Sequence, residues 1–272
     1  MIKRERYMAQ IRPFIGKDLV KVLTGIRRCG KSVMLSLIQD ELASTGISRD
    51  QFIAINLEQL DNAHLRTAKA LHAELRQRIG RIHGKAYLFL DEIQEAADWE
   101  WCVNSLRVDA DCDIYITGSN AKLLSGELAT YLAGRYVTFT LYPFSFSEFL
   151  DMLQQAGQSA DKAAAFRQYI QFGGMPFLSH LLNSPEARFQ YLRDVGNAIM
   201  LKDIVSRHNI RDIDQLERIV RYIFANIGQP FSATSLSRYF KNEKRAISTE
   251  TVLNYIRFCT EACLFHKVSR ED

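Results

Sequence analysis

The stretch that decides the fold is Gly25-Ile26-Arg27-Arg28-Cys29-Gly30-Lys31-Ser32, which fits G-x-x-x-x-G-K-[ST] at every fixed position. An apolar run at residues 19–24 precedes it, and a helical pattern of apolar residues follows over residues 31–46. The glycines let the backbone wrap closely around an anion, and the N–H groups of the loop and of the helix N-terminus point at that anion. Strand, loop and helix in this order predict a phosphate-binding loop and argue against a chance match.

The predicted ligand of this loop is a nucleoside triphosphate with its magnesium ion. Lys31 is expected to reach the β- and γ-phosphates, and the hydroxyl of Ser32 is expected to bind Mg²⁺. All eight residues of the motif are therefore candidate nucleotide-binding residues, namely Gly25, Ile26, Arg27, Arg28, Cys29, Gly30, Lys31 and Ser32.

A second motif, Ala86-Tyr87-Leu88-Phe89-Leu90-Asp91-Glu92, is an apolar strand that ends in two carboxylates. We expect Asp91 to contact the nucleotide and to hold the magnesium ion through water, so that Ser32 and Asp91 form the metal site. We expect Glu92 to orient and polarise the attacking water, which makes it the main catalytic candidate. A strand that ends in a solvated acidic turn is common, so this motif alone does not indicate a catalytic site. It indicates one here because a phosphate loop lies upstream.

The run Thr117-Gly118-Ser119-Asn120 closes a further strand with polar groups. Ser119 or Asn120 is a candidate sensor of the γ-phosphate and the attacking water, and the sequence does not choose between them. A simple turn explains Gly-Ser-Asn equally well.

Arg135 lies between a predicted helix and the last predicted strand. An arginine at this place can reach the γ-phosphate of a neighbouring subunit and stabilise the charge of the transition state. If Arg135 acts in this way, the protein must be a homo-oligomer to be active. The alternative is a surface arginine paired with a carboxylate, which contributes little to stability.

The order of elements predicts an α/β protein with a parallel sheet covered by helices on both faces, because continuous apolar strands alternate with helices. The predicted strands are residues 19–24, 51–57, 86–90, 114–117 and 136–141, and the predicted helices among them are residues 31–46, 68–79, 99–108 and 123–132. After Pro143 the patterns are helical, with a break at Gly173-Gly174-Met175-Pro176. The predicted division is a P-loop ATPase domain at 1–143, a helical region at 144–210 and a winged helix-turn-helix at 211–272.

Several segments resemble a large prokaryotic family of ATP-binding proteins of the AAA+ superfamily: GIRRCGKS, YLFLDEIQ, DIYITGSNAKLL, LAGRYVTFTLYPFSFSEFL, QFGGMPF and YLRDVGNAIMLKDIVSRHNIRD. The resemblance covers nearly the whole chain. It implies an ATPase core, a helical region and a winged helix, with ATP and Mg²⁺ as cofactors. It also implies the roles given above for Lys31, Ser32, Asp91, Glu92 and Arg135. Members usually continue beyond the winged helix, so we expect this sequence to be truncated at its C-terminus.

The last part of the chain, residues 216–268, has the pattern of two helices, a longer helix and a short strand, which is the order of a winged helix-turn-helix. Duplex DNA is therefore one predicted partner. The residues expected to contact bases or phosphates are Asn254, Arg257, Lys241, Lys244 and Arg245. Winged helices also mediate protein contacts, and nearby glutamates dilute the basic charge, so a protein partner remains open.

Charge, cysteine content and hydropathy limit the remaining functions and the cellular location. The net charge of +4 permits nucleic-acid binding without arguing for it. The five cysteines form no metal-binding or CxxC pattern, which indicates reduced thiols in a cytoplasmic protein, and the position of Cys29 in the loop predicts access for thiol reagents. No apolar run is long enough to cross a bilayer, and the N-terminus lacks the pattern of a signal peptide.

Two functions from different classes remain at this point. The first is an ATPase whose hydrolysis drives a conformational change, with DNA as one candidate target. The second is a nucleotide-dependent protein-interaction switch with negligible hydrolysis. A third hypothesis is that the chain is a degenerate remnant that only binds ATP.

Overall fold

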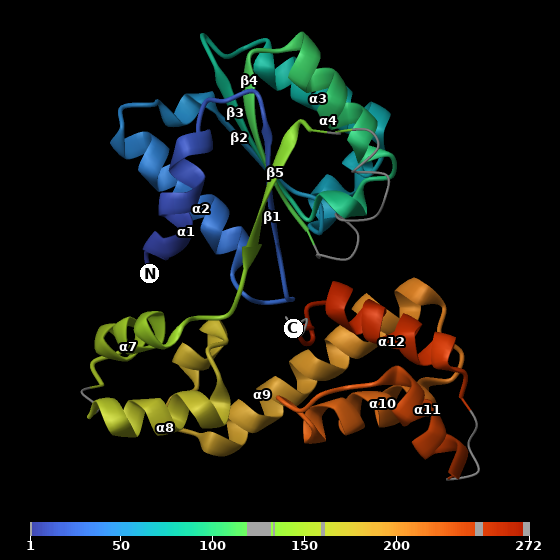
Figure 1. Cartoon of the computed structure of the whole chain (residues 1–272). Coiled ribbons are helices and arrows are strands. Elements are labelled where there is room, and N and C mark those ends of the chain that lie inside the picture. The colour runs from blue at the N-terminus through green and yellow to red at the C-terminus, as the bar shows by residue number, and fades with distance from the viewer. Residues whose placement is uncertain (1, 119–131, 133, 159–160, 243–246, 269–272) are drawn as a thin grey trace. The chain divides into compact units, whose positions relative to one another are not determined.

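The computed structural model describes residues 2–118, 132, 134–158, 161–242 and 247–268 (Figure 1). The chain forms two compact units, Met1–Leu192 and Arg193–Asp272. The division predicted at residues 143 and 210 is finer than this and stays a prediction.

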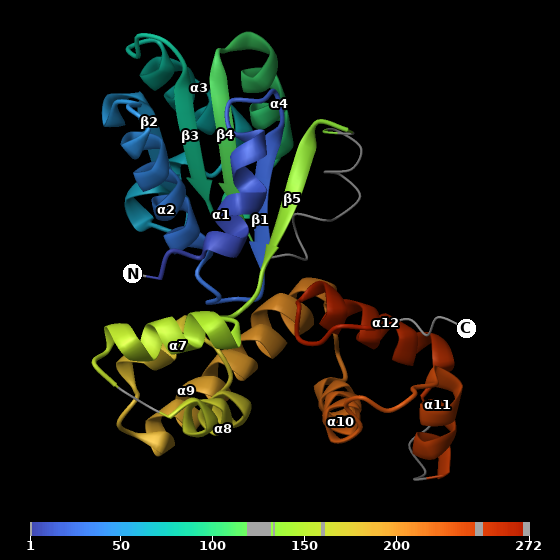
Figure 2. The same ribbon diagram turned by 60° about the vertical axis from the view of Figure 1, so that its left-hand side comes forward.

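The first unit is built on a five-stranded sheet. Its strands are β1 (Val20–Gly25), β2 (Phe52–Asn56), β3 (Ala86–Asp91), β4 (Cys112–Thr117) and β5 (Tyr136–Leu141). Their order is β2-β3-β4-β1-β5, and every neighbouring pair is parallel (Figure 2). The predicted α/β architecture with a parallel sheet is thus confirmed. β4 lies between the strand that precedes the phosphate loop and the strand that ends in the two carboxylates.

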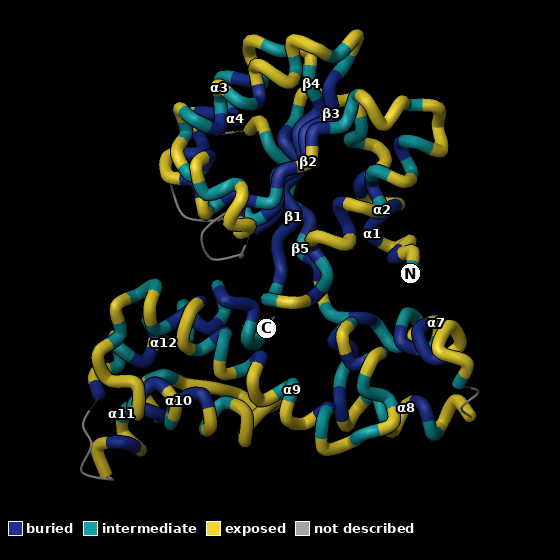
Figure 3. The backbone as a smooth tube through the Cα atoms, turned by 180° about the vertical axis from the view of Figure 1, so that it is seen from behind, coloured by how far each residue is buried: buried dark blue, intermediate teal, exposed yellow. Residues whose placement is uncertain are grey.

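Two hydrophobic clusters cover the two faces of this sheet. On one face α1 (Glu5–Ile11) and α2 (Lys31–Ser44) pack on side chains such as Leu23 and Phe89. On the other face α3 (Ala68–Ile79) and α4 (Trp99–Asp109) pack on side chains such as Val22 and Leu88. Successive residues of a strand point to opposite faces, so a strand buried on both faces must be apolar throughout. Figure 3 shows the central strands buried and the outer faces of the helices exposed.

The first unit continues beyond the sheet as a helical region. α7 (Phe146–Gln155) begins at Ser145, which forms a capping box with Glu148, and α8 (Lys162–Phe172) follows. The two helices share a small core of their own that includes Phe149. A 3₁₀ segment (Pro176–His180) then leads to α9 (Pro185–Ala198), whose last residues lie in the second unit.

The described part of the second unit is helical. α9 continues as a π-helical segment (Ile199–Ser206), followed by α10 (Ile213–Ala225), α11 (Ala233–Asn242) and α12 (Thr249–Glu261). These helices agree with the predicted order. The short strand expected after α12 is absent from the described residues 262–268. A strand needs a hydrogen-bonded neighbour, and the described residues of this unit include no strand that could pair with it. The prediction of this wing strand was therefore wrong for residues 262–268.

No helix of the described residues is long and apolar enough to span a membrane.

The break between α8 and α9 yields the first testable prediction. The carbonyl of Gly174 accepts a hydrogen bond from the N–H of Phe144 at 2.7 Å, and a Cβ on Gly174 would lie 2.0 Å from the carbonyl oxygen of Phe144. Gly174→Ala should therefore force two backbone segments apart and lower the free energy of unfolding by about 1–3 kcal/mol. Urea denaturation measures this change.

Gly196→Ala is the matched control for this prediction. Gly196 lies within α9, and an added Cβ there would meet no atom within 4 Å. Alanine in a helix interior should leave the stability unchanged or raise it by about 0.5–1 kcal/mol. Equal unfolding midpoints for Gly174→Ala and the wild type would contradict the proposed steric role.

Candidate functional site

The phosphate loop has the predicted context of strand, loop and helix. β1 ends at Gly25, and Gly30 caps the N-terminus of α2. A Cβ on Gly25 would lie 2.1 Å from the carbonyl oxygen of Leu141 in β5, so only glycine fits at this turn. Lys31 is 6% exposed, and its Nζ lies 3.3 Å from the carbonyl oxygen of Gly25 and 3.4 Å from that of Ile26. The ammonium group is therefore held at the loop by neutral carbonyls, which leaves its charge for an anionic ligand.

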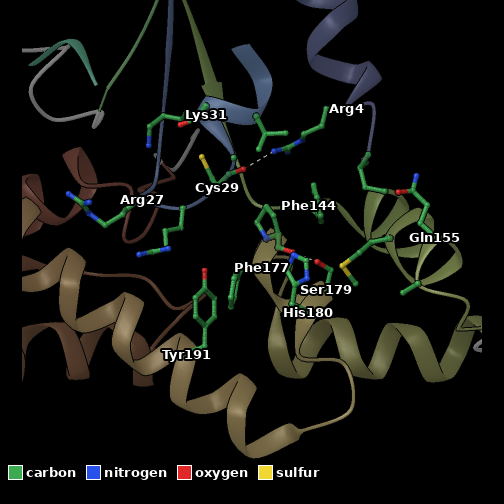
Figure 4. Close-up of a pocket in the computed structure, with 18 of the residues that line it drawn as sticks. Arg4, Arg27, Cys29, Lys31, Phe144, Gln155, Phe177, Ser179, His180 and Tyr191 are labelled. Carbon is green, nitrogen blue, oxygen red and sulfur yellow. Dashed lines mark hydrogen bonds between the residues drawn. The ribbon is translucent and has the colours of Figure 1, made fainter. Parts of the chain in front are cut away.

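A cavity of about 750 Å³ opens onto this loop (Figure 4). It is within the size range of sites that enclose small ligands. Residues 27–33 of the loop line it on one side, together with Glu58 and Glu92. The apolar part of its wall consists of Ile2, Phe144, Met152, Ala156, Pro176 and Phe177. Gln155, Ser179, His180 and Tyr191 add polar groups.

Asp91 is 6% exposed, and its carboxylate is held by side chains from the two neighbouring strands. The hydroxyl of Thr117, at the end of β4, donates a hydrogen bond to Oδ1 of Asp91. The side-chain amide of Asn56, at the end of β2, donates to Oδ2 at 2.9 Å. The hydroxyl of Thr117 also accepts a hydrogen bond from the backbone N–H of Glu92 at 3.0 Å. Thr117 thus holds both Asp91 and Glu92, the acidic pair at the end of β3.

Asn56 and Thr117 are site residues that sequence reasoning missed. Each is the last residue of a strand, where an apolar run ends in a polar side chain. The parallel register places Asn56 directly beside Asp91. The strand order β2-β3-β4 could have identified both residues, but it is not written in the local sequence.

Arg4 is a further residue that the motifs did not indicate. Its side chain is 2% exposed and forms an ion pair with Glu148 of α7 at 3.0 Å. Its guanidinium also donates to the carbonyl of Cys29 at 3.0 Å and to that of Tyr142 at 2.7 Å. The dashed line in Figure 4 marks the bond to Cys29. One buried cation therefore joins the phosphate loop to the segment between β5 and α7 and to α7 itself.

Cys29 corrects an expectation. Its side chain is 0% exposed and packs in the core under the loop, and burial raises the pKa of its thiol. The predicted access for thiol reagents is therefore wrong, because the thiol faces the protein interior and stays protonated at neutral pH.

Magnesium fits the donors that the site offers. Mg²⁺ is usually held by one or two carboxylates or hydroxyls, several waters and the phosphates of the substrate. Ser32 is exposed at the start of α2, and Asp91 presents a carboxylate whose orientation is fixed. Among the described residues, no group of three His, Cys, Asp or Glu side chains could hold a metal ion alone. The phosphates would therefore have to complete the coordination.

Arg135 does not line the cavity of its own chain. Its carbonyl accepts a hydrogen bond from the N–H of Val20 at 3.0 Å, which places it at the amino end of β1. A strand of six residues spans about 17 Å, and the phosphate loop follows the other end. Arg135 is exposed, so its role in a neighbouring subunit stays a prediction. Ser119 and Asn120 lie outside the described residues.

The predicted DNA-contacting residues are placed only in part. Lys241 is exposed at the end of α11, and Asn254 and Arg257 lie on α12. The guanidinium of Arg257 lies over the ring of Phe258 at 5.2 Å and pairs with Glu261 at 3.8 Å. Lys244 and Arg245 lie outside the described residues, so binding of DNA stays a prediction.

Comparison with known proteins shows the family of this chain. A curated protein of Haemophilus influenzae, named only as an uncharacterized protein, is 34% identical over 272 residues, which is 100% of this chain and 68% of that protein. The chain belongs to the same family as this protein. Residues 17–150 match the family described as AAA domain, and residues 163–271 match a domain of unknown function (DUF8612). The first unit therefore carries an AAA-type P-loop ATPase domain.

Two further proteins are similar to this chain. The uncharacterized protein MJ1544 of Methanocaldococcus jannaschii is 31% identical over 253 residues, which is 90% of this chain and 55% of that protein. The solved Walker-type ATPase PABY2304 of Pyrococcus abyssi has a TM-score of 0.64 at 16% identity, with 96% of this chain and 90% of that chain covered. At this identity the likeness shows the fold alone.

The contacts of Thr117 in the AAA domain yield the second prediction. Thr117→Val keeps the shape of the side chain but removes the donor to Asp91 and the acceptor for the N–H of Glu92. Loss of a hydrogen bond to a buried charged group should lower the free energy of unfolding by about 1.5–3 kcal/mol. Binding of Mg·ATP should weaken as well, because the carboxylate of Asp91 loses its fixed orientation. Urea denaturation and calorimetry measure the two effects.

Thr138→Val is the matched control on β5, an edge strand of the same sheet. The hydroxyl of Thr138 is buried, and it is without a hydrogen-bond partner in the described part of the chain. Its removal should leave stability and nucleotide binding unchanged, or raise the stability slightly, because no hydrogen bond is lost. If Thr117→Val behaves like this control, the bridging role of Thr117 is wrong.

Proposed function

We propose that this chain is a Mg²⁺-dependent ATPase that couples its nucleotide state to a conformational change. The observation that carries the proposal is that Glu92 and the phosphate loop line one cavity. The loop N–H groups, Lys31 and the N-terminus of α2 supply the positive potential that a triphosphate needs. Glu92 supplies a carboxylate next to the position where the γ-phosphate would lie. These are the components that hydrolysis requires.

In this proposal each residue has one task. Lys31 binds the β- and γ-phosphates, while Arg27 and Arg28 extend the positive wall of the cavity. Ser32 and Asp91 hold the magnesium ion, which supplies charge neutralisation on the phosphates. Glu92 accepts a hydrogen bond from the attacking water and orients it toward the γ-phosphate.

The proposed base subsite is the apolar part of the cavity. Ile2, Phe144, Met152 and Pro176 offer apolar surfaces on which a purine can pack, and Gln155 offers an amide for the polar edge of the ring. Only the family resemblance favours adenine over guanine.

The proposed route of coupling runs through the helical region. Met152 and Gln155 belong to α7, and Pro176 belongs to the 3₁₀ segment, so a bound nucleotide contacts these elements as well as the sheet. Arg4 already fixes α7 to the phosphate loop. A nucleotide that alters the conformation of the phosphate loop therefore also alters the contacts by which Arg4 holds α7 to the loop. The proposed targets of this motion are duplex DNA or a protein bound by the second unit.

One observation favours the alternative of a switch with negligible hydrolysis. Arg135 lies at the amino end of the sheet, away from the cavity of its own chain. In phosphoryl-transfer enzymes that rely on an arginine finger, the rate without that arginine is lower by about 10³–10⁵. An isolated subunit would then bind ATP and turn it over very slowly.

Release of phosphate from Mg·ATP tests the proposal, with wild type, Lys31→Ala and Glu92→Gln measured side by side. Lys31→Ala should lose ATP binding because the phosphates lose their cation. Glu92→Gln should keep ATP binding and lose at least about 100-fold in turnover, because the amide cannot act as a base. Addition of duplex DNA should raise the wild-type rate if DNA is the partner. A wild type that binds ATP but releases no phosphate, with or without DNA, would support the switch instead.

A mixing experiment tests the role of Arg135. Arg135→Ala and Glu92→Gln should each be inactive alone. If Arg135 acts on the γ-phosphate of a neighbouring subunit, mixed oligomers contain sites with an intact Glu92 and an intact Arg135, so activity should return on mixing. Full activity of Arg135→Ala alone, or no recovery in the mixture, would contradict a role in trans.

A further inference from the structure

The 3₁₀ turn that follows β3 carries a side chain that the proposed mechanism has not used. The turn spans Ile93–Glu95, and the side-chain amide of Gln94 donates a hydrogen bond from Nε2 to Oε2 of Glu92. Oε1 of Gln94 is buried and is without a hydrogen-bond partner in the described part of the chain. A buried amide normally satisfies its carbonyl as well, so an orphaned carbonyl needs an explanation.

The orientation of this amide follows from its neighbour. An ionised carboxylate is an acceptor only, so the NH₂ group of Gln94 must face Glu92 and the carbonyl must point away. The backbone of the turn is fixed, because Ile93 is fully buried and the N–H groups of Glu95 and Ala96 donate to the carbonyls of Glu92 and Ile93 at 3.0 Å. Gln94 is therefore held in a place where one end of its amide can pair and the other cannot.

We propose that Gln94 is a positioning residue that holds the carboxylate of Glu92 toward the phosphate cavity. This inference rests on the proposed ATPase function. Glu92 lines the cavity, and Gln94 is not among the residues that line it. Gln94 therefore occupies Oε2 from outside the cavity and leaves Oε1 of Glu92 available for the attacking water.

The backbone of Glu92 explains why such support is needed. Glu92 has φ 52°, a left-handed conformation that is uncommon for a residue with a side chain. Its N–H is held by Thr117, and in the described part of the chain its carboxylate accepts a hydrogen bond from Gln94. A base that is displaced by even about 1 Å loses much of its effect on the rate. The hydrogen bond from Gln94 restricts the rotamers of Glu92 without neutralising its charge.

The test compares Gln94→Leu and Gln94→Glu with wild type in the full chain, with Glu95→Gln as the control on the exposed residue of the same turn. Gln94→Leu should lower kcat for Mg·ATP about tenfold or more, with KM and the Kd for ATP changed less than about twofold. Glu95→Gln should match the wild type. Unfolding midpoints identify any variant that does not fold.

Gln94→Glu gives a readout that a purely structural role would not produce. At high pH the introduced carboxylate repels Glu92, and kcat should fall as far as in Gln94→Leu. As the pH is lowered the two carboxylates share a proton, so that the introduced side chain donates an O–H bond to Glu92 and kcat should rise. Wild type has no such pair of carboxylates, so its kcat should not rise in this way as the pH is lowered. The other titratable groups that line the cavity are unchanged in all variants, namely Arg4, Arg27, Arg28, Cys29, Lys31, Glu58, His180 and Tyr191.

Three results would overturn the inference. Unchanged kcat in Gln94→Leu would show that the hydrogen bond does not position the base. A pH profile of Gln94→Glu parallel to that of the wild type would show that Gln94 does not act through Glu92, even if Gln94→Leu fails to fold. A wild type that binds ATP without releasing phosphate would remove the proposed hydrolysis itself and this inference with it.

Discussion

The backbone hydrogen bonds that hold β4 between β1 and β3 decide where the polar side chains of this protein meet. β4 pairs in parallel with both neighbours, through residues such as Leu23 and Thr117 on one side and Leu90 and Ile116 on the other. All strands therefore end at the same edge of the sheet, and the hydroxyl of Thr117 comes beside the carboxylate of Asp91. If β1 and β3 were direct neighbours, the phosphate loop and the acidic pair would still be close, but no hydroxyl would stand between them.

Burial of Arg4 is the second feature on which the site depends. Removal of a guanidinium from water is costly unless its hydrogen bonds and charge are satisfied. Arg4 meets this condition only because the phosphate loop, the segment at Tyr142 and Glu148 of α7 all supply acceptors. Stable burial of this one cation thus requires three distant segments to be in place together.

Local patterns predicted the elements of the chain well. α3 and β5 have the bounds that periodicity and β-branched residues indicated. The wrong predictions concern contacts between segments that are distant in the sequence. Cys29 lies in the expected loop, but the packing of α1 and α2 buries its thiol. The strand expected after α12 lacks a partner in the described part of its unit, and pairing between distant segments cannot be read from a short apolar run.

The sequence by itself determined the phosphate loop, the acidic pair and the parallel sheet, because each depends on residues that are contiguous or repeat with a fixed period. Lys31, Ser32, Asp91 and Glu92 follow from such patterns. Only the tertiary structure decided which side chains support them. Asn56, Thr117, Arg4 and Gln94 reach the site through strand order, burial and the geometry of one turn. For Asn56, Thr117 and Arg4 these are properties of distant segments that folding brings together. Gln94 is close to Glu92 in the sequence, but the backbone conformation of the turn decides that their side chains meet.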